Sequence, residues 1–275
     1  HSLFGIAACP LTSNARFVEL MSHLGFDILT YKSVRSIEWH GNAFPHWLYA
    51  NMLNQLTLSD IDQELKTQTK PFENDDVTMA NSFGVHSLQP RYWQGDFEDA
   101  QQKMGDGKVL ILSLMPTPIE GQTLVDDAST LGKLGAQTSA KVFEINLACP
   151  NTDGGKGLIY EDLDLSLKLC TALKKEIGER PLIVKVGYFK DQEAINFFMK
   201  SSKGIIAGFS SANTYARKVT NNEGKGAFPG RPMAGISGSA IRTLSLQQAE
   251  NIAQYRDELG LKDFVLIGIG GVTKP

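Results

Sequence analysis

The chain has 275 residues, of which 42% are apolar and 21% are charged, and its net charge is −3. This length and apolar content provide a full-sized core, either as one large α/β domain or as two small ones. The mildly acidic balance without a Lys/Arg block argues against nucleic-acid or membrane-surface binding, and no run approaches the roughly 18 apolar residues of a membrane span.

Short apolar runs alternate with helical patterns along the chain. The pattern predicts seven β-strands, at residues 4–8, 26–33, 109–114, 142–148, 182–186, 205–211 and 264–271. After the first strand, Phe17, Leu20, Met21 and Leu24 recur at helical spacing, with Ser13 placed to cap the helix. Further helices are expected near residues 124–139, 165–177, 195–203 and 244–259, and a long Gly- and Asn-rich loop follows the sixth strand.

The strand pattern predicts an α/β fold. Near-continuous apolar strands indicate a parallel sheet covered on both faces, and the length and repeat count favour a (β/α)8 TIM barrel over an open doubly wound sheet. Such a barrel has eight strands. We therefore expect residues 1–275 to be a single barrel domain that lacks its C-terminal strand and helices, and the initial His1 suggests truncation at the other end as well. Residues 51–77 are polar and are expected to be an exposed insertion, either surface decoration or a lid.

The cysteines and histidines indicate neither a disulfide scaffold nor a metal site. Cys9, Cys149 and Cys170 lie far apart without a Cys-x-x-Cys motif, and the histidines lack paired spacing. With no visible secretory signal, this pattern favours the reducing cytoplasm. Cys9 and Cys170 are expected to be packing residues, because small buried cysteines are common.

The alternation of strand residues places chemistry inside the barrel. In the strand at 142–148, Glu144 and Asn146 share one face, and the apolar face suits the helices. Lys185 faces inward in the same way from the strand at 182–186. A buried lysine is costly without a partner. Two alternatives stay open: a structural ion pair with Glu144, or a cation that faces an electron-rich ligand.

Polar residues and glycines gather where the predicted strands end, and these ends form one rim in a parallel barrel. Lys32 lies in "YKS", Asn81 in "NSFG" and Asn213 in "SSANT". Backbone N–H groups of the turns at 235–238 and 268–271 could cradle a phosphate. The chain shows no Ser-His-Asp set and no carboxylate pair, so this inventory suits a flavin phosphate and a flat, amide-rich substrate better than hydrolysis.

These motifs together resemble the dihydroorotate dehydrogenase family, in order and over nearly the whole chain. The resemblance rests on "YKS" followed by Gly41, Asn42 and Pro45, and on "NSFG", "NLACPN", "VKV", "ANT", "GISG" and "GIGG". It implies a (β/α)8 barrel with FMN at the rim and the oxidation of dihydroorotate to orotate in de novo pyrimidine biosynthesis. Cys149 and Lys32 match the soluble class, in which a cysteine is the general base and a hydride passes to flavin N5.

The resemblance also implies which residues bind substrate and cofactor. The substrate residues would be Lys32, Asn81, Ser82, Phe83, Gly84, Val85, Asn146, Asn151, Asn213 and Thr214. The FMN residues would be Ala7, Ala8, Lys32, Ser33, Asn146, Lys185, Ala212, Gly238, Gly270 and Gly271. We further expect a homodimer. The sequence has no NAD fingerprint and no Cys cluster for an iron–sulfur centre, which an electron-transfer partner subunit could supply.

Three alternatives remain at this stage. Another FMN-dependent pyrimidine reductase, of the dihydrouracil type, would be indicated by a histidine in place of Asn151. A non-redox phosphate-binding lyase or isomerase would explain the glycine turns but not the asparagines. A barrel retained as a binding or structural module would not need Cys149 and both lysines. The yellow colour of bound FMN would separate the flavin enzymes from the other two classes.

Overall fold

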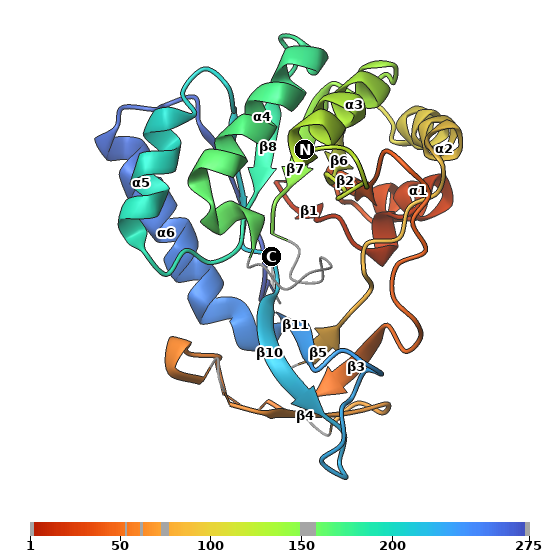
Figure 1. Cartoon of the computed structure of the whole chain (residues 1–275), viewed down its shortest axis with the longest axis vertical. Helices are drawn as coiled ribbons and strands as arrows, with labels where there is room; N and C mark the ends of the chain where they lie inside the picture. Colours follow the sequence, from red (N-terminus) through yellow and green to blue (C-terminus); the bar gives the residue numbers. More distant parts are fainter. Residues whose placement is uncertain (1–2, 53, 61–62, 73–76, 149–157, 273–275) are drawn as a thin grey trace.

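The computed structural model describes residues 3–52, 54–60, 63–72, 77–148 and 158–272, and these form two β-sheets with helices packed around the larger one (Figure 1). The larger sheet has seven parallel strands in the order β1-β2-β6-β7-β8-β9-β12. Their bounds are β1 Gly5–Ile6, β2 Ile28–Val34, β6 Val109–Leu114, β7 Val142–Asn146, β8 Leu182–Lys185, β9 Gly208–Ser211 and β12 Val265–Gly268. Each of the seven predicted strands coincides with one of them, although β2 runs one residue past its predicted end, so the parallel α/β prediction is confirmed. The eight-stranded barrel stays a prediction.

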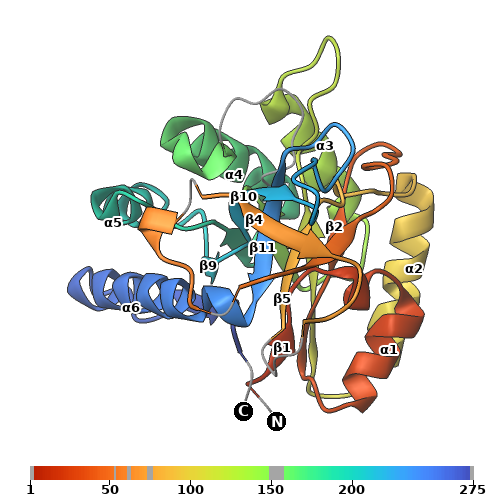
Figure 2. The same ribbon diagram turned by 90° about the horizontal axis from the view of Figure 1, so that it is seen from below.

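Helices cover the outer face of this sheet (Figures 1 and 2). They are α1 Ala15–His23, α2 Pro90–Lys103, α3 Leu124–Ala136, α4 Leu163–Ile177, α5 Gln192–Ser201 and α6 Arg242–Glu258, with short 3-10 helices η1 Pro10–Thr12, η2 Leu58–Asp60, η3 Ile159–Glu161 and η4 Ser239–Ile241. No helix in the described part of the chain is long and apolar enough to cross a membrane.

The two faces of the parallel sheet differ in polarity. Leu112 of β6, Phe143 of β7 and Val184 of β8 are fully buried in the core shared with the helices. Successive residues point to opposite faces of a strand, so Glu144 and Lys185 point to the interior, as predicted. The packing of the apolar face therefore places a set of buried polar side chains inside the curled sheet.

Of the predicted apolar stripe of α1, only Met21 is buried. Phe17, Leu20 and Leu24 are 39%, 49% and 64% exposed, whereas Ala15, Val18, Met21 and Ser22 are buried. The Ala15 N–H donates to Asp96 Oδ2 at 2.8 Å, and Ser22 Oγ donates to the Met104 carbonyl at 2.8 Å. These two bonds to α2 and its C-cap orient the helix. Its N-cap is Asn14 rather than Ser13, because the Asn14 side chain accepts from the Phe17 N–H at 3.0 Å.

The second sheet closes into a small barrel in the order β10-β11-β5-β3-β4. Its strands are β3 Trp47–Ala50, β4 Leu65–Gln68, β5 Thr78–Asn81, β10 Tyr215–Thr220 and β11 Met233–Gly238. The predicted loop after the sixth strand is wrong, since β10 and β11 form an antiparallel pair within it. Residues 51–77, predicted to be an insertion, include β4, which pairs with β3 and β10.

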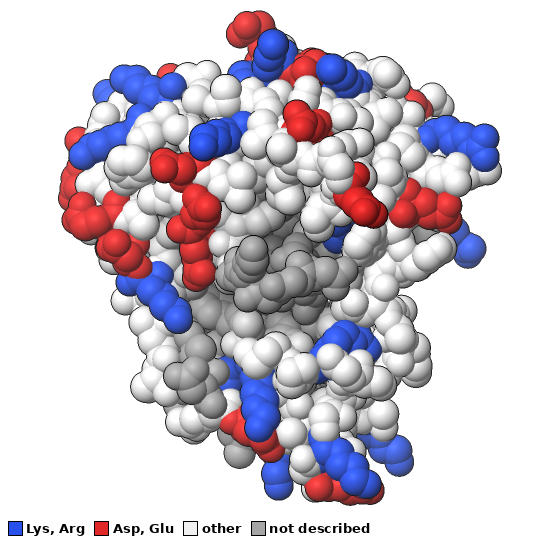
Figure 3. Space-filling view, viewed as in Figure 1, with Lys and Arg blue, Asp and Glu red and all other residues white. Residues whose placement is uncertain are grey.

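The small barrel lies beyond the carboxyl end of β8, where the functional residues were expected (Figure 1). On the face seen in Figure 3, basic and acidic side chains are interspersed, as the small net charge indicates.

Candidate active site

Asn146, the last residue of β7, is held in the interior of the parallel sheet. Its Nδ2 atom donates to Ser33 Oγ at 3.1 Å, and its Oδ1 atom accepts from the Ala148 N–H at 3.2 Å. The side chain is 5% exposed. Two residues predicted to contact the cofactor, Asn146 and Ser33, are therefore in direct contact.

Lys185 is the register partner of Asn146 on β7 and of Ser210 on β9, and it is 4% exposed. The first of the two alternatives, an ion pair with Glu144, is not formed. The Glu144 oxygens instead accept from Ser113 Oγ at 2.7 Å and from Ser210 Oγ at 2.6 Å. Within the described ranges, Lys185 has no ion-pair partner. A buried ammonium in this position requires an electron-rich group to face it, so the interior fits a bound ligand such as FMN.

The predicted substrate loop after β5 is a tight turn. Gly84 has φ +71° and Val85 has φ +48°. A Cβ atom on Gly84 would lie 2.7 Å from the backbone nitrogen of Asn42, which leaves room only for glycine. Asn42 Nδ2 donates to Ser82 Oγ at 3.1 Å and to the Ser82 carbonyl at 3.3 Å. The Gly41–Asn42 motif thus fixes the loop at residues 82–85.

Lys32 belongs to the same neighbourhood. Burial lowers the pKa of His86, which follows the loop, and the positive charge of Lys32 lowers this pKa further. Lys32 is itself 9% exposed on β2. The structure therefore brings one of the two predicted lysines close to the predicted substrate loop.

Three further substrate residues meet where β9 leads into β10. Asn81 Nδ2 donates to the Gly235 carbonyl at 3.0 Å, and Asn213 Nδ2 donates to the Ala148 carbonyl. A Cβ atom on Gly235 would lie 2.2 Å from Thr214 Oγ1, so Thr214 packs directly on this glycine. Cys149 and Asn151, the predicted base and a predicted substrate residue, lie outside the described residues.

The two glycine-rich turns meet at the start of η4 and α6. Gly238 has φ +101° and precedes η4, while a Cβ atom on Gly271 would lie 2.4 Å from Arg242 Cα. Arg242 Nε donates to the Gly271 carbonyl at 2.9 Å. A Cβ atom on Gly270 would lie 2.7 Å from Ser245 Oγ of α6. The two turns therefore pack together at a helix N-terminus, a position that suits an anion, and FMN phosphate binding there stays a prediction.

The remaining predicted cofactor residues are alanines. Ala212 is fully buried, and its N–H donates to the Ile269 carbonyl at 3.2 Å, which ties it to the strand before Gly270. Ala7 and Ala8 follow β1 and are half-buried. Their contact with FMN stays a prediction.

Sequence reasoning missed two arginines that hold the substrate loop. Arg35 Nε donates to the Val85 carbonyl at 2.9 Å, and Arg231 NH1 donates to the Ser82 carbonyl at 2.7 Å. Arg35 stands directly after an apolar strand, and a charge at that position could have marked it. Arg231 lies in a Gly- and Pro-rich turn, where an exposed arginine is equally expected.

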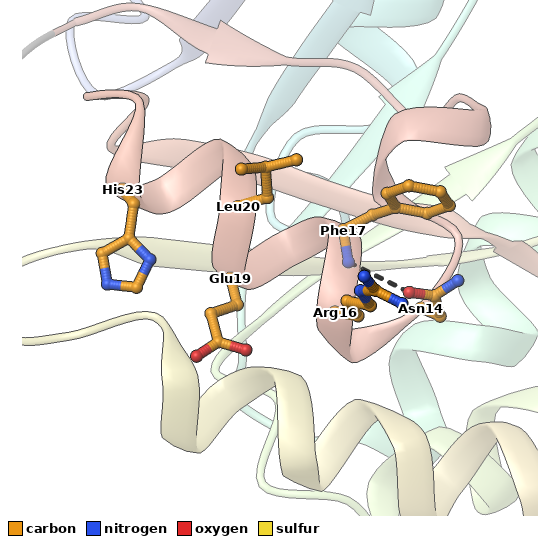
Figure 4. A pocket seen from close by; sticks show the side chains of 6 residues that line it. All are labelled: Asn14, Arg16, Phe17, Glu19, Leu20 and His23. Atoms are coloured by element: carbon orange, nitrogen blue, oxygen red, sulfur yellow. Dashed lines mark hydrogen bonds between the residues drawn. The ribbon is translucent and has the colours of Figure 1, made fainter.

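A groove on the outside of α1 is lined by Asn14, Arg16, Phe17, Glu19, Leu20 and His23 (Figure 4). All six residues come from α1 and its N-cap, and this helix covers the outer face of the parallel sheet. The groove is therefore separate from the polar interior.

The fold and the site define a class: an α/β protein with a parallel sheet whose strand ends carry an asparagine- and lysine-rich small-molecule site next to an anion cradle. The family model described as dihydroorotate dehydrogenase matches residues 6–274. The chain therefore belongs to the dihydroorotate dehydrogenase family, which confirms the predicted resemblance.

Individual relatives agree with this assignment. The chain is 31% identical to a dihydroorotate dehydrogenase of Dictyostelium discoideum, over 100% of this chain and 76% of that protein. It is 25% identical to the catalytic subunit of dihydroorotate dehydrogenase B (NAD(+)) of Alkaliphilus metalliredigens, over 56% of this chain and 48% of that protein. It is 22% identical to dihydroorotate dehydrogenase A (fumarate) of Lactiplantibacillus plantarum, over 57% and 49%.

Proposed function

We propose that this chain oxidises dihydroorotate to orotate, with FMN bound at the carboxyl end of the parallel sheet and with Cys149 as the general base. The family assignment supports the reaction, which makes the chain an oxidoreductase of pyrimidine biosynthesis. The observation that supports a flavin is Lys185, a buried cation beside Asn146 without an ion-pair partner in the described part of the chain. An eighth strand that closes a (β/α)8 barrel belongs to the same proposal.

The residues of the interior would hold FMN in two places. Gly238, Gly270 and Gly271 would place backbone groups against the phosphate, while Lys185 and Asn146 would face the ring system. Bound FMN would supply a hydride acceptor. The buried surroundings of Lys185 would strengthen its attraction for electron-rich ring atoms, because water screens the charge poorly there.

The proposed base, Cys149, lies three residues after the end of β7 in the sequence. Oxidation of dihydroorotate removes one proton and one hydride, and a thiolate at Cys149 would take the proton from C5. An ordinary thiol has a pKa of about 8.5, so a modest shift makes it an effective base near neutral pH. Asn213 holds the carbonyl of Ala148, the residue before Cys149. Asn81, Asn146, Asn151, Asn213 and Thr214 would hydrogen-bond the substrate.

An electron-transfer partner is part of the proposal. Several relatives are named as catalytic subunits of an NAD(+) enzyme, which supports a second subunit that reoxidises the flavin. The homodimer and the cytoplasmic location are further parts of this proposal. The family match gives no support to the non-redox lyase or isomerase alternative.

The test of the proposed base is the variant Cys149→Ala. We expect FMN to stay bound and flavin reduction by dihydroorotate to slow by about 10²-fold or more, the usual effect of a lost general base. Anaerobic stopped-flow absorbance measures this rate. Cys149→Ser should retain part of the activity only at raised pH. Cys170→Ala, which removes a fully buried thiol of α4, is the control and should reduce at the wild-type rate.

Three outcomes would count against the proposal in different ways. Reduction of Cys149→Ala at wild-type speed would show that Cys149 is not the general base, while the proposed reaction would stand. A wild-type protein that binds no FMN would remove the flavin chemistry altogether. Reduction by dihydrouracil in place of dihydroorotate would favour the other pyrimidine reductase.

A further inference from the structure

Polar side chains from β2, β6, β7 and β9 form one continuous hydrogen-bonded chain inside the parallel sheet. Asn146 Nδ2 lies 3.1 Å from Ser33 Oγ, which lies 2.9 Å from Ser113 Oγ. Ser113 Oγ lies 2.7 Å from Glu144 Oε1, and Ser210 Oγ lies 2.6 Å from Glu144 Oε2. Every member is at most 5% exposed. The chain therefore connects a buried carboxylate to Asn146 at the proposed active site.

The carboxylate at one end fixes the direction of every bond in this chain. Each oxygen of Glu144 accepts a hydrogen bond from one serine hydroxyl. Ser113 has a single hydroxyl proton, which it gives to Glu144, so it must accept from Ser33. Ser33 has then used its own proton and must accept from the NH2 group of Asn146.

The other end of the chain requires the same orientation of Asn146. The backbone N–H of Ala148 can only donate, and it lies 3.2 Å from Asn146 Oδ1. The amide oxygen must therefore face Ala148, and the amide nitrogen must face Ser33. Two independent groups, a carboxylate and a backbone N–H, set one orientation of a side chain that could otherwise turn by 180° at little cost.

We infer that Glu144 is a positioning residue of the active site, because its carboxylate sets the direction of the Ser113–Ser33–Asn146 chain and so holds the Asn146 amide in one orientation. The second N–H of Asn146 is then left to donate to a ligand. The Ser33 oxygen can only accept from a ligand, because its proton is committed to Ser113. This role rests on the proposed function, since it specifies the groups that FMN and substrate would meet.

Two serines of the chain provide a matched test. Ser113→Ala and Ser210→Ala each remove one buried hydroxyl that donates to Glu144. Of these two serines, only Ser113 lies on the hydrogen-bonded path from Glu144 to Asn146. If the network merely stabilises the core, both variants should lose similar thermal stability and keep similar ligand affinity. Glu144→Met removes both bonds but also leaves unpaired serines, so the two alanine variants carry the test.

We expect the two variants to differ in binding rather than in folding. Thermal unfolding of the FMN-free proteins should show similar losses for both. The FMN dissociation constant, measured by quenching of flavin fluorescence, should rise by about tenfold more in Ser113→Ala than in Ser210→Ala, the scale of one lost hydrogen bond of good geometry. Equal FMN affinities of the two variants would overturn the inference.

A second measurement is independent of FMN. The side-chain amide resonances of Asn146, followed by ¹⁵N-edited NMR of the FMN-free protein, should change in Ser113→Ala and stay in place in Ser210→Ala. Unchanged resonances in Ser113→Ala would also overturn the inference. If the wild-type protein binds no FMN, the proposed function fails, while the NMR comparison still decides whether Glu144 orients Asn146.

Discussion

Lys185 is the side chain whose substitution tests the proposed FMN binding. It is 4% exposed and has no carboxylate partner in the described ranges. Lys185→Met keeps the length of the side chain and removes the charge. We expect FMN affinity to fall by about tenfold or more, as for a lost charged contact, while the FMN-free protein is as stable as before or more so. Fluorescence titration and thermal unfolding measure the two effects.

The control for this prediction is Lys200→Met on the exposed side of α5, which should change neither quantity. A purely structural role for Lys185 would give the reverse result. In that case thermal stability would fall and the flavin would bind as in the wild type.

Arg35 holds the substrate loop through hydrogen bonds to its backbone carbonyls. It is 2% exposed, and its guanidinium donates to the carbonyls of Val85 and Gly84 and to Thr117 Oγ1 while it lies over the Trp39 ring, 4.6 Å from the centroid. Lysine lacks the planar fork that makes these bonds. Arg35→Lys should therefore cost about 2–4 kcal/mol and speed amide exchange at residues 82–88. Hydrogen–deuterium exchange with mass spectrometry measures the loop directly.

Arg180 offers the matched control. It also donates to backbone carbonyls and lies over an aromatic ring, that of Phe143, at 4.9 Å. It stands just before β8, at the opposite end of the strands from the loop. Arg180→Lys should lose stability without faster exchange at residues 82–88, and equal exchange in both variants would contradict the assigned role of Arg35.

At the scale of single elements, the N-terminus of α3 shows how a cap becomes dependent on pH. Thr123 Oγ1 accepts from the Asp126 N–H at 3.1 Å and donates to the Asp126 carboxylate at 2.7 Å. These bonds from Thr123, its hydroxyl first, lower the pKa of Asp126 below its ordinary value of 3.8. A lowered carboxyl pKa adds stability above that ordinary value, and the gain is lost as the pH falls through the folded-state pKa.

The variant Thr123→Ala should cost about 1 kcal/mol at neutral pH, as for other lost caps. The cost should shrink as the pH falls from about 4 through the lower folded-state pKa of Asp126, and it should vanish once Asp126 is protonated even with Thr123 present. Urea unfolding at several pH values measures the difference. Thr130→Ala on the same helix removes a hydroxyl bonded to the Asp126 carbonyl, and its cost should not depend on pH.

Elements with one dominant pattern were predictable from the sequence, and elements with competing patterns were not. The continuous apolar runs identify all seven parallel strands, and the leucines of α4 identify its buried face. In α1 two stripes compete, and the smaller one is buried because Ala15 and Ser22 bond α2 and its C-cap. The strands of the small barrel, such as β3 and β4, are four residues long and pair with distant segments, so local pattern does not reveal them.

The same limit applies to the site. Asn146 and Asn213 could be placed near strand ends from the sequence, because parallel strands end at one rim, whereas Asn81 ends an antiparallel strand of the small barrel. The Ser113–Glu144 contact could not, since it depends on the register between β6 and β7. The sequence therefore shows which side chains lie near the ligand but not which ones orient them.

At the scale of the whole molecule, the small barrel has its own apolar cluster, but segments packed on the parallel sheet contribute to it. The cluster inside the small barrel includes Tyr188, Ile241 and Leu244, which belong to segments packed on the parallel sheet. We therefore expect one cooperative unfolding transition rather than two. Two variants that keep a single tryptophan, Trp47 in the small barrel or Trp93 in α2, should report the same midpoint by fluorescence. Midpoints that differ clearly would show that the small barrel unfolds separately.

The topology of the small barrel also determines when its strands can pair during synthesis of the chain. Its strands β4 and β10 pair in parallel, and the Thr67 hydroxyl donates to the Thr220 carbonyl across 153 residues of chain. A ribosome that adds about 5–20 residues per second needs roughly 8–30 s to span that interval. During this time β4 lacks β10 and β5 lacks β11, and an unpaired strand edge invites association with other chains. Asn81 cannot reach the Gly235 carbonyl until β11 emerges. The nascent chain is therefore most in need of chaperones before it can first bind substrate.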